Sequence, residues 1–384
     1  ARGRWLASLN PAWDYASAEL KMLRAEHSGT TRSTQHAARS TWETSPRPTR
    51  LALLRAVRAA DPVAGRELLR STWASEKADD RAAFLAELRA GLGPGDEPFL
   101  EAALDDRSKE VRATAADLLS RLPGSQLSQR MCERLRPLLS WWPGEPAKLL
   151  GLRLGRGPRL EAVLPAAYDK GMARDGVEQR PRSTALGERA WWLAQMLAAV
   201  PPAEWSAAWH TAPEELVQAA LQHELADALL SGWWAATARH PDAAWAEALL
   251  IHATRRTLAA IAAGGSTAQA LVEQLPPEHF ERFALAQLGV PGGLELIAAA
   301  QRPWSLTLAR AAVAALQAEL RKGARSVWRD GYLLQAIGQR APAALYAEFD
   351  RGWPTDAPAW PQWAGYVAQA RELLEFRYVM LKEI

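Results

Sequence analysis

The residue types of this sequence that bind metals or act as nucleophiles are few and scattered. None of its seven histidines has another histidine four residues away, and no His-Glu-x-x-His motif occurs. A zinc site needs three or four such ligands brought together. The single cysteine, Cys132, excludes an internal disulfide and a thiolate zinc cage, and it is typical of a reducing compartment. The sequence therefore predicts no metal site, no cofactor and no catalytic residue.

A glycine-rich turn, Gly91–Gly95, leads into a predicted helix and could cradle a phosphate group. An anion site at a helix start favours Lys, Ser or Thr, whereas Asp96 and Glu97 follow this turn directly. We interpret the segment as the end of one helix and the acidic first turn of the next. Neither the Gly-x-Ser-x-Gly nucleophile motif nor a phosphate-binding P-loop motif occurs.

Three arginines recur at a fixed interval and are candidates for binding. Arg50, Arg81 and Arg112 are each 31 residues apart, so an array of repeated units would place them in one row. One interpretation is a basic stripe for phosphate groups or an acidic partner. The other is a ladder of internal ion pairs with nearby carboxylates, of which the candidates are Asp79, Asp80, Asp105 and Asp106.

Two further candidates lie in a long segment rich in Gly, Pro and Arg. Arg174 and Asp175 precede Gly176, and long loops often carry function. A salt-bridged turn is the competing interpretation. The candidate binding residues are therefore Arg50, Arg81, Arg112, Arg174 and Asp175.

Helical periodicity dominates the chain and predicts an all-α fold. Between Ser108 and Leu122 the apolar residues recur at positions i, i+4, i+7, i+8 and i+11, which puts them on one helix face. We expect Val111, Leu118 and Leu119 on that face to be buried. Alternating strand patterns and β-branched residues are rare, so strand content is expected to be negligible.

An internal repeat specifies how these helices are arranged. Residues 50–58 align with 81–89, and Trp42 aligns with Trp73, at the same offset of 31. Such a spacing fits two helices of about 12 residues with their turns. Because each pair leaves an apolar face for a neighbour to cover, we expect a HEAT-like α-solenoid of stacked antiparallel helix pairs. The segment 100–122 looks like one HEAT repeat.

Composition divides the chain into three parts. Residues 1–142 are predicted to form N-terminal HEAT-like repeats, 143–187 an irregular insertion with a short strand at 149–154, and 188–384 C-terminal helical repeats. The helices expected in the last part span residues 188–200, 213–239, 242–262, 267–275, 277–288, 304–322, 325–339, 341–351 and 361–382.

The formal net charge of +3 is unevenly distributed, since residues 1–60 and 146–190 are basic and the rest is mildly acidic. No apolar run is long enough to cross a bilayer. The first residues lack an apolar leader and an initiating Met, so we expect Ala1 to be the start of a fragment and not of a signal peptide. The single cysteine favours a reducing, cytoplasmic setting. The 18 tryptophans are either core residues at wide helix junctions or anchors on a binding surface.

A wider resemblance is carried by segments in the first half of the chain. They are Trp73 with Glu76, Asp80-Arg81, and the ranges 96–101, 105–112, 122–125, 174–176 and 187–193. Over roughly residues 45–260 the chain resembles a bacterial family of unknown function, whose members look like HEAT-type helical proteins. The resemblance implies genes nearby for SWIM zinc-finger proteins, MoxR-type AAA ATPases and von Willebrand factor A-domain proteins. It implies no activity.

The predicted function is a non-enzymatic scaffold or adaptor that binds protein partners through a curved helical-repeat surface. An AAA ATPase or an A-domain protein is the partner that the resemblance implies. The alternative is a nucleic-acid-binding HEAT-like protein, although the acidic residues of 61–145 dilute the positive charge of 1–60. A DNA-glycosylase-like enzyme is a variant of this alternative, and it would need an acidic residue in an aromatic-lined cleft.

Overall fold

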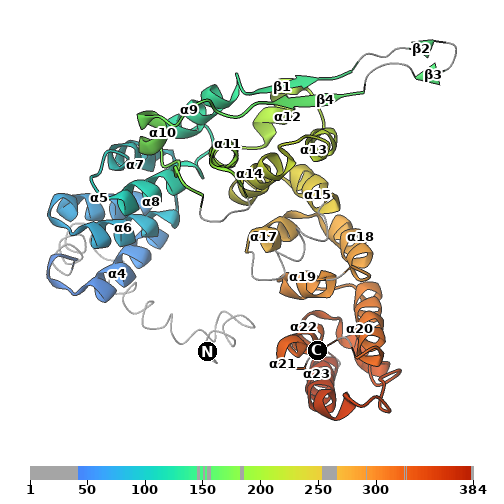
Figure 1. Ribbon diagram of the computed structural model, residues 1–384. Coiled ribbons are helices and arrows are strands. Elements are labelled where there is room, and N and C mark those ends of the chain that lie inside the picture. The colour runs from blue at the N-terminus through green and yellow to red at the C-terminus, as the bar shows by residue number, and fades with distance from the viewer. Residues whose placement is uncertain are drawn as a thin grey trace. The chain divides into compact units, whose positions relative to one another are not determined.

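Contacts divide the chain into two compact units, and Figure 1 labels helices and strands of both. The first contains the residues up to Ser125 together with Arg174–Gly176, and the second contains Gln126–Ala173 and the residues from Val177 onward. The computed structural model describes residues 42–144, 148–149, 152–153, 157–181, 186–252, 266–290, 292–323, 325 and 327–381. Most of the basic segment 1–60 and the end of the helix expected over 242–262 lie outside these ranges.

The first unit consists of helices joined by short turns. The helices are α4 (Arg47–Ala60), α5 (Pro62–Thr72), α6 (Ala78–Ala86), α7 (Glu97–Ala103) and α8 (Lys109–Leu119), with 3-10 turns η2 (Trp73–Ser75), η3 (Glu87–Arg89) and η4 (Pro94–Asp96). α4 packs against α5 and α6, and α6 packs against α8. The three helices that the 31-residue offset aligns are therefore consecutive neighbours.

Helix α8 has the cap and the buried face that the sequence predicts. The Ser108 hydroxyl accepts a hydrogen bond from the Val111 N–H, which satisfies one of the free donors of the first turn. Val111, Leu118 and Leu119 are buried, so the predicted helix register is confirmed.

The second unit is also mostly helical, in agreement with the predicted all-α class. Its helices are α9 (Gln126–Leu135), α11 (Glu188–Ala198), α12 (Ala203–Trp209), α13 (Pro213–Leu221), α14 (Ala226–Arg239), α15 (Ala243–Ile251), α17 (Ser266–Gln274), α18 (Pro277–Gln287), α19 (Gly293–Ala299), α20 (Leu306–Arg321), α21 (Val327–Asp330), α22 (Tyr332–Arg340) and α23 (Trp360–Met380), with the 3-10 turn η5 (Ala343–Ala347). The short helix α10 (Lys170–Arg174) ends where the chain enters the first unit.

Six helices of the second unit pack one after another, and we call them the α11–α23 row. Its members in order are α11, α14, α17, α19, α22 and α23 (Figure 1). Glycines permit close approach at two of these junctions. A Cβ on Gly232 of α14 would lie 2.5 Å from the Leu197 Cβ of α11, and one on Gly338 of α22 would lie 3.3 Å from the Ala370 carbonyl oxygen of α23.

Five side chains link the C-terminal ends of the row. Each extends from the end of one helix, or from just after it, and donates to a carbonyl in the last turn of the preceding helix. The donor–acceptor pairs are Arg239 to Ala198, Gln274 to Thr237, Arg302 to Val272, Arg340 to Ala298 and Arg377 to Gly338. Such carbonyls lack intrahelical donors and carry partial negative charge, which favours these donors. Because consecutive C-terminal ends lie together, the six helices run in the same direction.

The intervening helices form a second set of neighbours. α13 packs against α15, and α18 packs against α20. α15 and α18 are linked by Glu247, whose carboxylate contacts His279 at 2.7 Å and Arg282 at 2.6 Å. Burial raises the pKa of Glu247, but hydrogen bonds from these two residues outweigh burial, so its pKa lies below the ordinary value.

A β-ribbon crosses the boundary between the segment predicted to form helical repeats, which contains β1, and the segment predicted to be irregular. Strands β1 (Leu139–Trp142) and β4 (Arg159–Ala162) pair antiparallel, and β2 (Lys148–Leu149) pairs with β3 (Leu152–Arg153) between them in the chain. β2 and β3 fall near the strand expected at 149–154, whereas β1 and β4 were not predicted. Each has four residues, which is too short for alternation to stand out in the sequence. The alternating burial of β4 becomes visible only in the fold.

Several helix boundaries also differ from the prediction. The helix expected over 213–239 is broken between α13 and α14, and the one over 325–339 is broken at Gly331, where a Cβ would meet the Tyr366 ring. The segment 341–351 forms only the 3-10 turn η5. The short helices α12 and α19 were not predicted. Among the described residues, no helix has both the length and the apolar character needed to cross a membrane.

Candidate functional site

The first arginine of the predicted row, Arg50, lies in an aromatic and acidic cradle. Its guanidinium carbon is 4.1 Å from the centre of the Trp42 ring and 4.6 Å from that of Phe84. It donates to both Glu76 oxygens, one of them at 3.1 Å, and to the Thr72 hydroxyl at 3.2 Å. Burial raises the pKa of Glu76, but the hydrogen bonds from Arg50 and Thr72 outweigh burial and leave its pKa below the ordinary value.

The second arginine, Arg81, is buried and makes a bidentate ion pair. Its Nε and Nη2 atoms donate to the two Asp106 oxygens, each at 2.9 Å, and Nη1 donates to the Glu76 carbonyl oxygen at 2.7 Å. Asp106 also accepts from the Ser108 N–H. Arg112 donates to the carbonyl oxygen of Asp106 at 2.7 Å and to that of Arg107 at 3.1 Å. All three row arginines therefore connect neighbouring segments of the unit.

Arg174 and Asp175 belong to the same unit but to a different cluster. Arg174 donates to the two Asp105 oxygens at 2.7 and 3.1 Å, and its Nη1 lies 3.6 Å from the Glu101 carboxylate. The hydrogen bond to Asp105 raises the Arg174 pKa. Asp175 is buried and lies 3.3 Å from Arg174. Gly176 has a φ of 82°, and a Cβ there would come within 2.4 Å of the Ala116 methyl, so this turn requires glycine.

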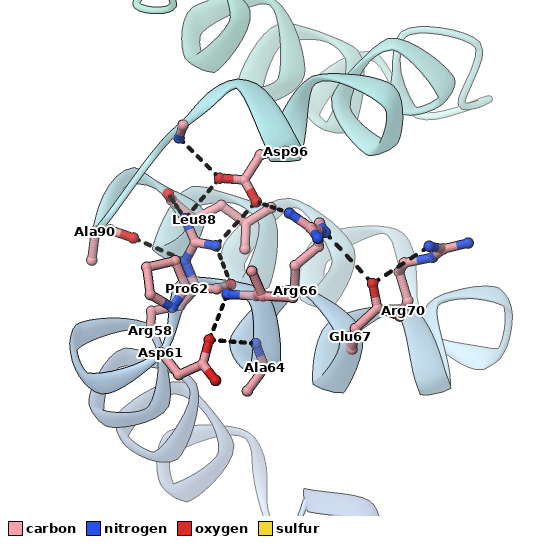
Figure 2. Close-up of polar contacts among 12 residues, drawn as sticks. Arg58, Asp61, Pro62, Ala64, Arg66, Glu67, Arg70, Leu88, Ala90 and Asp96 are labelled. Atoms are coloured by element: carbon pink, nitrogen blue, oxygen red, sulfur yellow. Dashed lines mark hydrogen bonds and ion pairs between the residues drawn. The ribbon is translucent and has the colours of Figure 1, made fainter.

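Among the described residues, the most completely buried ionic group is one that we did not predict from the sequence. Arg58 of α4 is fully buried and pairs with Asp96, whose oxygens lie 3.1 and 3.0 Å from Nη1 and Nη2 (Figure 2). Its remaining donors bind the carbonyl oxygens of Pro62, Leu88 and Ala90. Arg58 thus uses all five N–H donors of its guanidinium group.

The Asp96 carboxylate accepts hydrogen bonds from several donors. It accepts from Arg66 at 3.1 Å and from the Gly93 N–H at 3.1 Å, in addition to Arg58 (Figure 2). The glycine-rich turn before Asp96 therefore binds, through the Gly93 N–H, a carboxylate that pairs with the buried Arg58. This agrees with the acidic helix start that we inferred there.

An exposed arginine and a half-buried tryptophan meet across the β1–β4 strand pair in the second unit. The register places Trp142 opposite Arg159, and the Arg159 guanidinium carbon is 5.1 Å from the centre of the Trp142 ring. Arg159 also lies 2.9 Å from Glu161 on the same strand. Sequence analysis missed this pair, because the two residues are far apart in the chain and meet only through strand pairing.

The other face of the ribbon base packs on tryptophans of α12. The Trp141 ring stacks on Trp209 with centroids 6.5 Å apart, and Trp209 lies 5.2 Å from the buried Trp205. His223 accepts from the Ala162 N–H at 3.3 Å, and α13 packs against β4. These contacts fix the β1–β4 strand pair, which is the base of the ribbon, to the second unit.

Exposed apolar side chains gather at the C-terminal end of α23. Phe376, Val379 and Met380 are 57%, 47% and 45% exposed, and Leu381 follows at 66%. The first three are spaced i, i+3 and i+4, so they are neighbours on the helix surface. We call these four residues the α23 apolar patch. We predicted from the sequence that these residues belong to a helix, but not that they are exposed.

The remaining reactive groups of the described residues do not assemble into a metal site. Within the described part of the chain, no three His, Cys, Asp or Glu side chains are grouped to hold a metal ion. Cys132 is half-buried, and burial raises the pKa of its thiol, which opposes thiolate formation.

Comparison with known proteins identifies a family and nothing more specific. A family model described as a family of unknown function (DUF5691) matches residues 1–384. Neither the curated proteins nor the solved structures contain a match.

Proposed function

The chain belongs to DUF5691, a family of unknown function, and we propose that it is a non-enzymatic scaffold that binds a protein partner through a HEAT-like helical array. The observation that carries the proposal is the α11–α23 row. Five successive junctions repeat one arrangement, in which a side chain at the end of the later helix, or just after it, caps a C-terminal carbonyl of the earlier one. Repetition of one helix-to-helix interface is what defines a solenoid, and solenoids characteristically bind macromolecules along extended surfaces.

The α23 apolar patch is the docking position that we assign to the partner. At each earlier junction of the row, the next helix packs against the one before it. A partner helix packed on α23 in the same way would bury Phe376, Val379 and Met380. A basic or amide side chain at its C-terminal end would reach the last carbonyls of α23, as Arg377 reaches Gly338. The occupant is therefore an amphipathic helix of another protein, extending an interface that the chain already uses.

The candidate partners are the MoxR-type AAA ATPase and the von Willebrand factor A-domain protein that the sequence resemblance implies. A cytoplasmic location is part of this proposal. The alternative, nucleic-acid binding by the arginine row, would require Arg50 and Arg81 to release Glu76 and Asp106. A glycosylase-like reaction is disfavoured for a similar reason, since Glu76, beside the Trp42 and Phe84 rings, is occupied by Arg50.

Sedimentation velocity with purified proteins tests the proposal. We expect the chain to form a complex of defined stoichiometry with the ATPase or the A-domain protein, in the presence of nuclease. Replacing Phe376 and Met380 with Asp should weaken that complex at least tenfold, because charge is placed in a desolvated contact. The control is Val163→Asp, a substitution at another exposed apolar residue of the second unit, which is 56% exposed. Absence of any complex, or equal weakening by the control, would contradict the proposal.

A further inference from the structure

Helix α23 has two apolar faces, and the described part of the chain buries only one of them. The buried face consists of Trp363, Val367, Ala370 and Leu374. It belongs to a helix against which α22 and η5 pack. A helix that is apolar on more than one side is normally enclosed on each of those sides, so the second face calls for an occupant.

The second face follows the helix at heptad spacing. Its six members are alternately three and four residues apart, and we call them the α23 heptad stripe: Gln362, Tyr366, Gln369, Leu373, Phe376 and Met380. Leu373 is half-buried and the other five are exposed. The stripe includes Phe376 and Met380 of the α23 apolar patch and continues them toward the start of the helix. Its length is about 27 Å at the rise of an α-helix.

We propose that the partner helix carries a heptad repeat of its own and packs along the whole stripe as in a short coiled coil. This inference rests on the proposed function, in which an amphipathic helix of another protein docks on α23. Side chains that alternate three and four residues apart stay on one side of a helix and interlock with the same alternation in a neighbouring helix. The contact would therefore extend well beyond the α23 apolar patch.

A polar residue in the middle of the stripe specifies how the two helices align. Gln369 lies between Tyr366 and Leu373, and it is exposed. A buried amide without a hydrogen-bond partner is costly, and single polar residues in such seams fix the register of coiled coils. The partner helix therefore has a polar side chain opposite Gln369 and apolar side chains opposite Leu373 and Phe376.

The charge beside the stripe favours a basic partner. Glu372 is exposed and lies four residues before Phe376 and three after Gln369, so these side chains are surface neighbours. Among the described residues, none of the ion pairs involves Glu372, whereas Glu375 lies 3.4 Å from Arg371. Charges that flank a heptad seam select the partner helix by complementarity.

The same charge disfavours a second copy of this chain as the occupant. Identical helices pair about a twofold axis, which places a residue at the axis beside its own copy. An axis at the middle of the stripe, near Leu373, would bring two Glu372 carboxylates together. The occupant is therefore a helix with cations along the edge of its apolar seam.

Fluorescence anisotropy of the full chain with labelled three-heptad peptides tests this inference. Two peptides have Leu at every seam position except one central Asn, and they carry either Lys or Glu at the flanking positions. We expect the wild-type chain to bind the Lys peptide about fivefold more tightly than the Glu peptide, and Glu372→Lys to reverse this preference. Gln369→Leu should weaken binding of the Asn peptide and strengthen binding of an all-Leu version, each by about fivefold.

The matched control is Glu215→Lys, which makes the same change of charge at an exposed glutamate of α13 in the same unit. It should leave both affinities unchanged, and thermal melts establish that each variant is folded. Equal binding of the Lys and Glu peptides by the wild-type chain, or the same reversal in the control, would overturn the inference. A dimer of the chain alone that Phe376→Asp dissociates would also overturn it, and would assign the stripe to a second copy.

Failure of this inference is distinguishable from failure of the proposed function. If Phe376→Asp weakens the complex with the ATPase or the A-domain protein while Glu372→Lys and Gln369→Leu do not, the heptad contact is wrong and the docking position stands. If the peptides bind as expected but neither protein forms a complex, the heptad contact stands and the choice of partners is wrong.

Discussion

Replacing Arg58 with methionine is expected to lower the free energy of unfolding of the first unit by about 3–5 kcal/mol, the usual cost of breaking a fully buried ion pair. The substitution retains much of the apolar stem but removes every donor. Asp96 keeps only Arg66 and the Gly93 N–H, and the carbonyl oxygens of Pro62, Leu88 and Ala90, of which that of Leu88 is buried, lose their hydrogen bonds from Arg58. Unsatisfied buried acceptors add to the loss.

Urea denaturation of the full chain measures this effect. The control is Arg55→Met on the same helix, where the arginine is 65% exposed and pairs with Glu87. Exposed pairs contribute little, so we expect a change of about 0–1 kcal/mol there. An Arg58→Met variant no less stable than the Arg55→Met variant would show that the buried pair does not hold these helices together.

Truncation of Trp233 to alanine is expected to cost about 3–5 kcal/mol in the second unit. Trp233 is fully buried in α14, and its ring meets Trp245 of α15 edge-on, with centroids 5.0 Å apart. The substitution leaves a large cavity between the row and the intervening helices, and it removes an aromatic pair.

Thermal melts compare the stability of this variant with that of a variant at a less buried tryptophan. Trp142→Ala, at the half-buried ribbon position, should change stability by less than about 1 kcal/mol. If the two variants melted together with the wild type, the buried tryptophans would not be core residues. A large loss of stability in Trp233→Ala but not in Trp142→Ala would show that Trp233 is a core residue and Trp142 is not, a difference that the sequence does not reveal.

Local patterns in the sequence were enough to predict much of the helical architecture. The 31-residue offset identifies α4, α6 and α8 as neighbours, because consecutive repeats place equivalent residues side by side. It also leads to the Arg81–Asp106 pair, one of the internal pairings considered from the sequence. The helix face that includes Leu118 follows from periodicity alone.

Features formed by distant residues were not predictable in this way. Arg58 and Asp96 are 38 residues apart, and nothing local distinguishes Arg58 from its exposed neighbour Arg55. In the α11–α23 row, each capping side chain and its carbonyl are 30 to 42 residues apart in the sequence. Because this separation varies, no constant offset in the sequence predicts the pairs. The ribbon depends on a register that four-residue strands do not specify by themselves.

The proposed function is tested most directly by photo-crosslinking in living cells, with benzoylphenylalanine in place of Phe376. The account predicts an adduct whose crosslinked peptide maps to one helix of the AAA ATPase or the A-domain protein. The same group placed at Val163, which is 56% exposed, should give no such adduct. Equal crosslinking at both positions, or adducts at Phe376 spread over many unrelated proteins, would contradict a docking role for the α23 apolar patch.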